Sequence, residues 1–322
     1  MGSDDERGKT WDGRSRGGVW LFRICAFLLP YAGTFGARIG SYLIATGFLL
    51  VAGRRQYGSL DYFHRLDPRA GTLVLWMRTW RRYASFGRIL CDRFLAWLDQ
   101  DRYRFVYGDP DLLRRTVTGN RGVILLAAHL GNWELSGFRL TRMATAVVNL
   151  VMVRGDDGPI QDFVDARMRQ SNVRVIDPRD PLGASLAIHT ALQNGEVVCM
   201  LGDRVFGEQP WCHVDFLGGR ARFPLGPFHA AAITGAPIVV CFLMKRGDRD
   251  YFLYIDPPWH IPNPGRGPQR RRSLEAAAQR WARRLELQVR RYPMQWHNFY
   301  EFWENQKRSS DVRRPTSDVP QR

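Results

Sequence analysis

Apolar and polar positions follow one another from residue 121 onward in a pattern typical of short strands separated by helices. β-Rich apolar runs occupy residues 123–129, 145–154, 173–177, 196–203, 236–246 and 251–258. Helical patterns occur near residues 133–143, 159–171, 183–194 and 226–234, and again over residues 273–291. Strands that alternate with helices indicate βαβ units. We therefore expect an α/β fold with a mostly parallel central sheet flanked by helices.

Two further segments extend this pattern. Residues 57–107 carry periodic apolar and aromatic positions with several arginines among them, which predicts helix with a basic, amphipathic face suited to a membrane surface. The stretch HVDFLGGRARF, residues 213–223, predicts a β-hairpin that turns at Gly218-Gly219.

The segment that begins at Val19 is strongly apolar, but Arg23 and Arg38 interrupt it. The apolar stretches of residues 24–37 and 39–53 are both shorter than the roughly 20 residues that cross a bilayer. Pro30 and nearby glycines break the helical pattern between them. We expect two membrane-associated helices that lie in the bilayer interface. One tilted span and a buried helical hairpin of a soluble domain are the alternatives.

These patterns divide the chain of 322 residues into four parts. Residues 1–18 are polar and predicted to be disordered, and residues 19–56 form the membrane-associated helical segment. Residues 57–305 form one α/β domain, and residues 306–322 form a polar, disordered tail. The start of the chain lacks the pattern of a cleaved signal peptide.

The net charge and the cysteine spacing limit the classes of partner and of metal site that the chain can have. The formal net charge of +16 favours anionic partners, such as phospholipid headgroups, an acidic carrier protein or nucleic acid. Nucleic-acid binding is the weaker of these, because no helix-turn-helix, zinc-finger or RNA-recognition motif is present. The five cysteines are scattered without metal-ligand spacing, which argues against a disulfide framework or a zinc site.

The stretch VILLAAHLGNWE, residues 123–134, carries the candidate chemistry. His129 ends a strand-like run, Asn132 is suited to cap a helix, and Glu134 falls in the first helical turn. Because positions five apart on a helix diverge by about 140°, the pair meets only if His129 precedes the helix. We expect Glu134 to hold one imidazole N–H while the other nitrogen acts as a general base. Backbone N–H groups of Gly131 and Asn132 are candidates to face a developing oxyanion.

HLGNWE after an apolar strand resembles the H-x4-[DE] signature of the glycerolipid acyltransferase superfamily. Within it, the chain most resembles the lipid A biosynthesis acyltransferases. The likeness extends over roughly residues 20–305. It is carried by WRRYASFGRILCDRF, VMVRGDDGPIQDFVDARMRQSNVRVID, LQNGEVVCMLGDR, TGAPIVVCFLMKR and PMQWHNFYEFW.

This resemblance implies a glycerol-3-phosphate acyltransferase-like fold and transfer of a fatty acyl chain. The donor would be a thioester of acyl carrier protein or coenzyme A. The acceptor would be a hydroxyl of a membrane glycolipid such as a lipid A precursor. The implied location is the cytoplasmic face of a bacterial inner membrane, with no cofactor, metal or nucleic acid. Activation of water instead of the acceptor would make the protein a thioester hydrolase.

The resemblance also assigns residues. His129 and Glu134 match the catalytic pair, Arg154 matches an arginine near the acceptor, and Asp203 matches an acid that ends a later strand. Arg204 and the following GGRARFPLGP differ from the lipid A enzymes and are closer to relatives that modify aryl polyene pigments or other lipids. This difference leaves the acceptor open.

An apolar channel beside His129 is expected to receive the acyl chain and to measure its length. Its bulky walls would come from four aromatic residues: Trp133, Phe138, Phe223 and Phe228.

Overall fold

A computed structural model describes residues 19–51, 56–118, 122–136, 147–153, 172–263 and 265–304. The predicted tails 1–18 and 306–322 lie outside these residues, as does the helix expected near 159–171 and most of that near 133–143.

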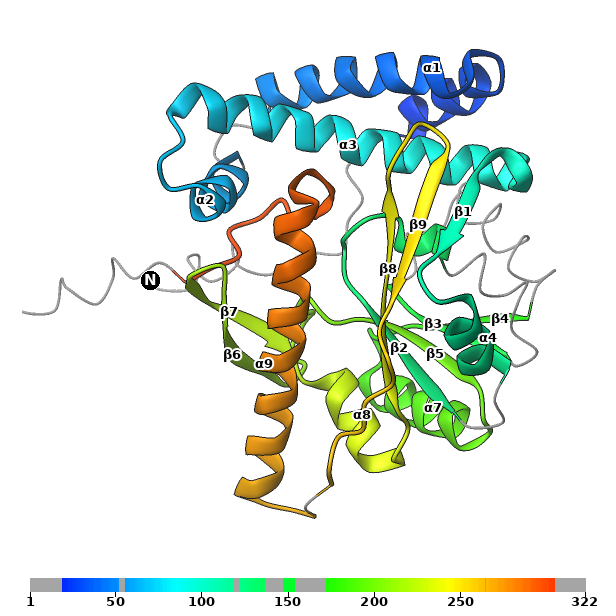
Figure 1. The fold of residues 1–322 in the computed structure, drawn as a ribbon, viewed down its shortest axis with the longest axis vertical. Coiled ribbons are helices and arrows are strands. Elements are labelled where there is room, and N and C mark those ends of the chain that lie inside the picture. The colour runs from blue at the N-terminus through cyan, green and yellow to red at the C-terminus, as the bar shows by residue number, and fades with distance from the viewer. Residues whose placement is uncertain are drawn as a thin grey trace, which may run out of the picture.

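The described part of the chain contains a seven-stranded sheet in the order β1-β9-β8-β2-β5-β3-β4 (Figure 1). All neighbouring strands are parallel except β8 and β9. The strands are β1 (Arg104–Tyr107), β2 (Val123–Ala127), β3 (Val148–Val151), β4 (Val173–Ile176), β5 (Val197–Leu201), β8 (Ile238–Lys245) and β9 (Asp250–Ile255). The predicted α/β fold with a mostly parallel sheet is confirmed.

Helices cover both faces of the sheet, and a separate hairpin joins β6 (Trp211–Phe216) to β7 (Gly219–Pro224) (Figure 1). One face packs against α7 (Pro181–Gln193), α8 (Gly226–Thr234) and α9 (Pro268–Arg291). The other packs against α3 (Thr72–Leu98) and α4 (Pro110–Thr118). Other helical elements in the described residues include α1 (Val19–Val51), α2 (Gln56–Leu66) and the short 3-10 turns η2 (Gln100–Arg102) and η3 (Pro293–Gln295).

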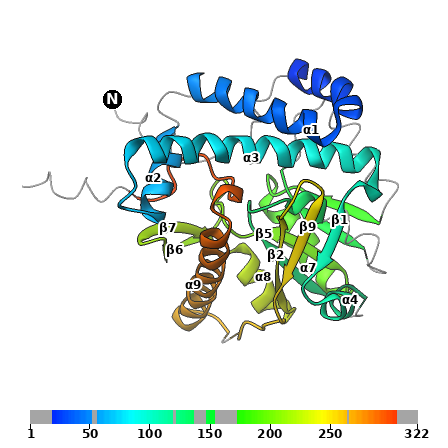
Figure 2. The ribbon, with the colours of Figure 1, turned by 45° about the horizontal axis from the view of Figure 1, so that its top comes forward.

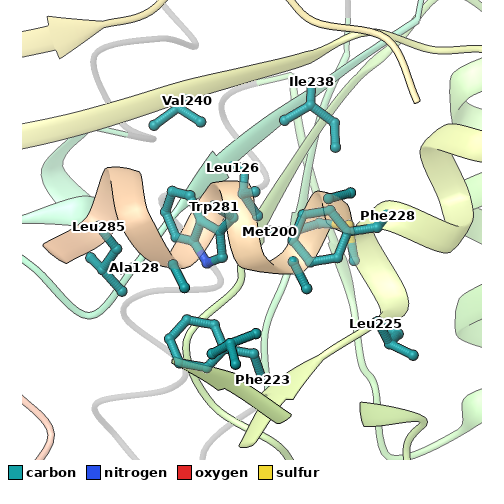
Figure 3. Packing of buried hydrophobic residues seen from close by; sticks show 14 of the residues in the cluster. Leu126, Ala128, Met200, Phe223, Leu225, Phe228, Ile238, Val240, Trp281 and Leu285 are labelled. Carbon is teal, nitrogen blue, oxygen red and sulfur yellow. The ribbon is translucent and has the colours of Figure 1, made fainter. Parts of the chain in front are cut away.

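Trp281 of α9 forms the centre of the larger hydrophobic core and is fully buried. Figure 3 shows it among Leu126 and Val240 of the sheet and Phe223 of the hairpin. Its indole Nε1 donates to the Gly202 carbonyl at 2.8 Å, so the only polar atom of this large side chain is satisfied. The contact ties α9 to the end of β5.

Two expectations need correction. The helix predicted over residues 57–107 is divided into α2 and α3 by residues 67–71, and α3 ends at Leu98. Residues 104–107 instead form an edge strand that pairs with β9, and their side chains alternate in exposure. The hairpin turns one residue earlier than predicted, at Leu217-Gly218, where both residues have positive φ. Such a two-residue turn matches the twist of the flanking strands.

α1 lies along α3 in both ribbon views (Figures 1 and 2). The predicted break between two helical halves occurs at Gly33, where φ is 58° and ψ is −153°. Buried small residues on α1, Ala37, Ser41 and Ala45, allow close approach to α3 near Gly87. Among the described residues, no helix combines the length and apolar character needed to cross a bilayer.

Candidate active site

The pairing of β2 with β5 brings the candidate histidine beside an aspartate. β2 is buried in the middle of the sheet, and its last residue, Ala127, lies opposite Leu201 at the end of β5. His129 and Asp203 each follow two residues later, so they come level at the carboxyl edge of the sheet. This edge is where parallel α/β sheets bind ligands. His129 Nδ1 and Asp203 Oδ1 are 2.8 Å apart.

Asp203 is completely buried and its carboxylate accepts several hydrogen bonds. The donors besides His129 Nδ1 are the His129 backbone N–H at 3.1 Å, Trp296 Nε1 at 3.0 Å and Asn298 Nδ2 at 3.0 Å. Burial alone would raise the pKa of Asp203, but interactions with His129, Arg204 and Trp296 outweigh it and lower the pKa to about 2. Ionised Asp203 therefore stabilises the fold above the ordinary pKa of 3.8, and this contribution is lost as pH falls toward 2.

The His129 ring is suited to accept a proton. Burial and the nearby Arg204 lower its pKa below 6.5, although Asp203 and Glu134 act in the opposite direction. The ring is therefore neutral at pH 7. Because the ionised Asp203 only accepts hydrogen bonds, Nδ1 carries the proton and Nε2 carries the lone pair.

The predicted hydrogen bond between Glu134 and His129 is wrong, because His129 Nδ1 bonds Asp203 instead. Glu134 bonds the guanidinium of Arg93, which lies on α3. Glu134 lies in the helical turn that begins at Trp133, and its side chain extends toward α3, while the imidazole Nδ1 faces Asp203 after the neighbouring strand. Glu134 still raises the pKa of His129 through its charge.

The turn residues Gly131 and Asn132 are where the sequence placed them, but their N–H groups are already used. Gly131 N donates to the Gln295 carbonyl at 2.9 Å, and Asn132 N donates to the Leu243 carbonyl at 2.8 Å. The expected oxyanion contact from these amides is therefore wrong. Gly131 has φ of 70°, and a Cβ there would lie 2.1 Å from the Leu243 oxygen. The Asn132 side chain caps the helix through Leu135 N, as predicted.

Of the remaining predicted residues, Arg154 lies outside the described residues. Arg204 donates to the His297 carbonyl at 2.7 Å and to the Asn298 side chain. We call residues 295–298 the C-terminal strap. Sequence reasoning did not assign the strap side chains that bind Asp203, because their only signal was an aromatic cluster near the end of the chain.

An apolar pocket adjoins this site on the sheet face that is covered by α3 and α4. Its lining includes Trp133, Leu125, Ala127, Cys199 and Cys241. Burial raises the pKa of the Cys241 thiol to about 12 and also raises that of Cys199, so both stay neutral. The pocket holds about 30 Å³, little more than a few waters need, so a longer ligand would have to move its walls.

The expected aromatic walls are only partly correct. Trp133 lines the pocket, whereas Phe223 and Phe228 pack in the core around Trp281 on the opposite face (Figure 3). Phe138 lies outside the described residues.

Comparisons with known proteins define the family. A family model described as "Bacterial lipid A biosynthesis acyltransferase" matches residues 80–305. A phosphatidylinositol mannoside acyltransferase of Mycobacterium tuberculosis is 24% identical over 242 residues, which cover 74% of this chain and 71% of that one. A lipid A biosynthesis palmitoleoyltransferase of Escherichia coli is 23% identical over 180 residues, covering 54% and 57%.

Among solved structures, the 1-acyl-sn-glycerophosphate acyltransferase PlsC of Thermotoga maritima matches with a TM-score of 0.37 and 17% identity, over 77% of this chain and 97% of that one. The family match covers more than half of the chain and includes the whole described site. The protein is thus an acyltransferase, an enzyme that takes an acyl donor and a lipid acceptor. It belongs to the bacterial lipid A biosynthesis acyltransferase family.

The two carboxylates can be distinguished by NMR of the His129 ring. In Asp203→Asn, the pKa of His129 should fall further and the Nδ1–H tautomer should lose its preference, because the negative acceptor is gone. In Glu134→Gln, the tautomer should be retained and the pKa should fall less. Imidazole ¹⁵N shifts across a pH titration measure both. A tautomer change in Glu134→Gln with none in Asp203→Asn would contradict this assignment.

Proposed function

We propose that the protein transfers a fatty acyl chain from an acyl thioester to a hydroxyl of a membrane glycolipid, with His129 as the general base. The observation that carries this proposal is the neutral His129, oriented by buried Asp203 and adjacent in the chain to Leu130, which lines the apolar pocket together with Trp133. His129 Nε2 would take the proton of the acceptor hydroxyl as its oxygen adds to the thioester carbonyl. Asp203 would stabilise the imidazolium that forms.

The thiol leaving group would then recover that proton from His129 as the C–S bond breaks. Glu134 contributes in this proposal through its negative charge, which favours the protonated ring, while Arg93 holds its carboxylate in place. Asp203 takes the role of hydrogen-bond partner that the H-x4-E spacing suggested for Glu134.

The net charge of the chain supports the proposed acyl donor, and the named relatives support the proposed lipid acceptor. Acyl carrier protein and coenzyme A are both anionic, which suits a chain of net charge +16. The mycobacterial relative is named for phosphatidylinositol mannoside, a lipid that carries a sugar, and the E. coli relative is named for lipid A biosynthesis. We therefore propose a glycolipid acceptor, with another lipid or a pigment of the aryl polyene type as the alternative.

The reaction can be tested with radiolabelled acyl carrier protein or acyl-coenzyme A and extracted glycolipid. Wild-type protein should move label to lipid, and His129→Ala should lower that rate by about 10²–10⁴-fold, since the base is lost. Below the lowered pKa of His129 the wild-type rate should also fall, as the ring becomes protonated. Label recovered only as free fatty acid would indicate a hydrolase, and an active His129→Ala variant would refute the general-base role.

We also propose that the acyl chain occupies the apolar pocket. The pocket walls at Ala127, Cys199 and Cys241 are small, so the hollow exists because three neighbouring strands lack bulky residues there. Each methylene transferred from water into such a pocket contributes about 0.8 kcal/mol. Once the walls have moved apart to admit the acyl chain, the depth that these residues allow would select its length.

Cys199→Phe should shorten the preferred acyl chain. Loss of two or three buried methylenes corresponds to about 2 kcal/mol, or roughly 30-fold in kcat/KM for the longest good donor, while short donors should be affected little. Donors of graded length measure this profile. Cys212→Phe is the matched control, because Cys212 is buried in the β6–β7 hairpin away from the pocket. An unchanged length profile in Cys199→Phe would exclude this pocket.

We further propose that α1 lies on the cytoplasmic face of the inner membrane. After the break at Gly33, a stripe at four-residue spacing, Phe35, Ile39 and Leu43, faces solvent, with Phe35 73% and Leu43 69% exposed. Removing one large apolar side chain from water is favourable by about 1.5–3 kcal/mol, so the stripe favours insertion of α1 into the membrane interface. α1 and α3 lie at the opposite end of the molecule from α7 (Figure 1).

Replacing both Phe35 and Leu43 by glutamate should abolish flotation with anionic phospholipid vesicles. The matched control replaces Leu182 and Leu186 of α7 by glutamate, since these leucines are 84% and 68% exposed but lie away from α1. The control protein should still float. Flotation of the α1 variant together with loss of flotation of the α7 variant would move the membrane surface to α7.

A further inference from the structure

The C-terminal strap places a second histidine directly beside His129. His297 N donates to the His129 carbonyl at 2.7 Å, and Gly131 N donates to the Gln295 carbonyl at 2.9 Å, around an antiparallel bridge between Leu130 and Trp296. In this register His129 and His297 lie opposite each other. Opposite residues in an antiparallel pair project from the same face with Cβ atoms about 5 Å apart.

The His297 side chain is buried, yet neither ring nitrogen has a hydrogen-bond partner among the described atoms. Its ring packs against Phe86, at 5.1 Å between centroids, and against Phe299, at 6.1 Å. A buried polar group without a partner costs about 1–3 kcal/mol, and such groups in native proteins commonly have a functional reason.

The environment keeps this ring neutral. Burial, followed by the charges of Arg82, Arg204 and His129, lowers the pKa of His297 well below 6.5. A neutral imidazole carries one N–H donor and one acceptor nitrogen. His297 is therefore a hydrogen-bond donor that needs no counter-charge.

Three backbone donors near His129 are already bound. The backbone N–H of His129 bonds Asp203, and those of Gly131 and Asn132 bond carbonyl groups of the protein. The acyl carbonyl oxygen gains negative charge when a hydroxyl adds to it, and a preorganised donor at this oxygen commonly lowers the barrier. Within the part of the site that the structure describes, the N–H of His297 is a donor still available for this oxygen.

We propose that His297 donates its ring N–H to the thioester carbonyl oxygen during acyl transfer, an inference that rests on the proposed function. As the acceptor oxygen adds to the acyl carbon, its proton passes to His129 Nε2 and the carbonyl π electrons move to the oxygen held by His297. When the carbonyl reforms, the C–S bond breaks and the thiolate takes the proton from His129. His297 keeps its own proton throughout.

His297→Phe tests this role, because a phenyl ring can occupy the same aromatic slot but has no N–H. The kcat should fall by about 10²–10³-fold, the usual effect of removing one oxyanion donor, while KM for the acyl donor changes less than about threefold. The melting temperature should stay level or rise, since two unpartnered polar atoms are removed. His297→Gln, which restores an N–H donor, should recover part of the rate.

Phe299→Leu is the control for packing: it loosens the same ring contacts without removing a donor, so it should lower stability more than kcat. Wild-type activity in His297→Phe overturns the proposal. The proposal is also overturned if the kcat of His297→Phe falls together with its melting temperature and His297→Gln does not recover any of the rate. If wild-type protein itself transfers no label to lipid, the proposed function fails, and this result is distinct from an active His297→Phe variant.

Discussion

The site depends on the parallel pairing of β2 with β5, because that register determines where each strand delivers its polar residue. With Ala127 opposite Leu201, His129 and Asp203 emerge level with each other at the carboxyl edge. Gly202 makes the arrangement possible, since a Cβ there would lie 2.9 Å from both Leu126 and Trp281. A slip of one residue would separate the imidazole from the carboxylate and turn one of them into the core.

A second constraint joins this edge to the helical layer above it. Arg82 of α3 is fully buried and donates to the carbonyl groups of Trp296 and Asn298, both at 2.7 Å. Burial lowers its pKa to about 10, so it remains charged at neutral pH. The aromatic faces of Tyr62 and Phe299 lie within 5 Å of its guanidinium carbon. The cation thus holds the strap against α3, the helix that α1 covers.

Neighbouring residues predict some parts of this structure, whereas contacts between distant parts of the chain determine others. The strands from β2 onward, α8 and the Asn132 cap follow from periodicity and neighbouring residues, and the structure confirms them. The hydrogen-bond partner of His129 cannot be predicted from neighbouring residues, because Asp203 is 74 positions away and reaches His129 only through the strand register. Spacing favoured Glu134, which is close in sequence but bonds Arg93 on another helix.

The two faces of the sheet differ in what they can accommodate. On the face toward α7, α8 and α9, large aromatic residues such as Trp281 and Phe228 fill the core. On the face toward α3, small side chains at Cys199 and Cys241 leave a hollow that begins beside Trp133. A chain bound there would lie on the same side of the sheet as α1, whose apolar stripe faces outward. In the proposed reaction, a lipid acceptor held at α1 and an acyl chain bound in this hollow would approach His129 from the same side of the sheet.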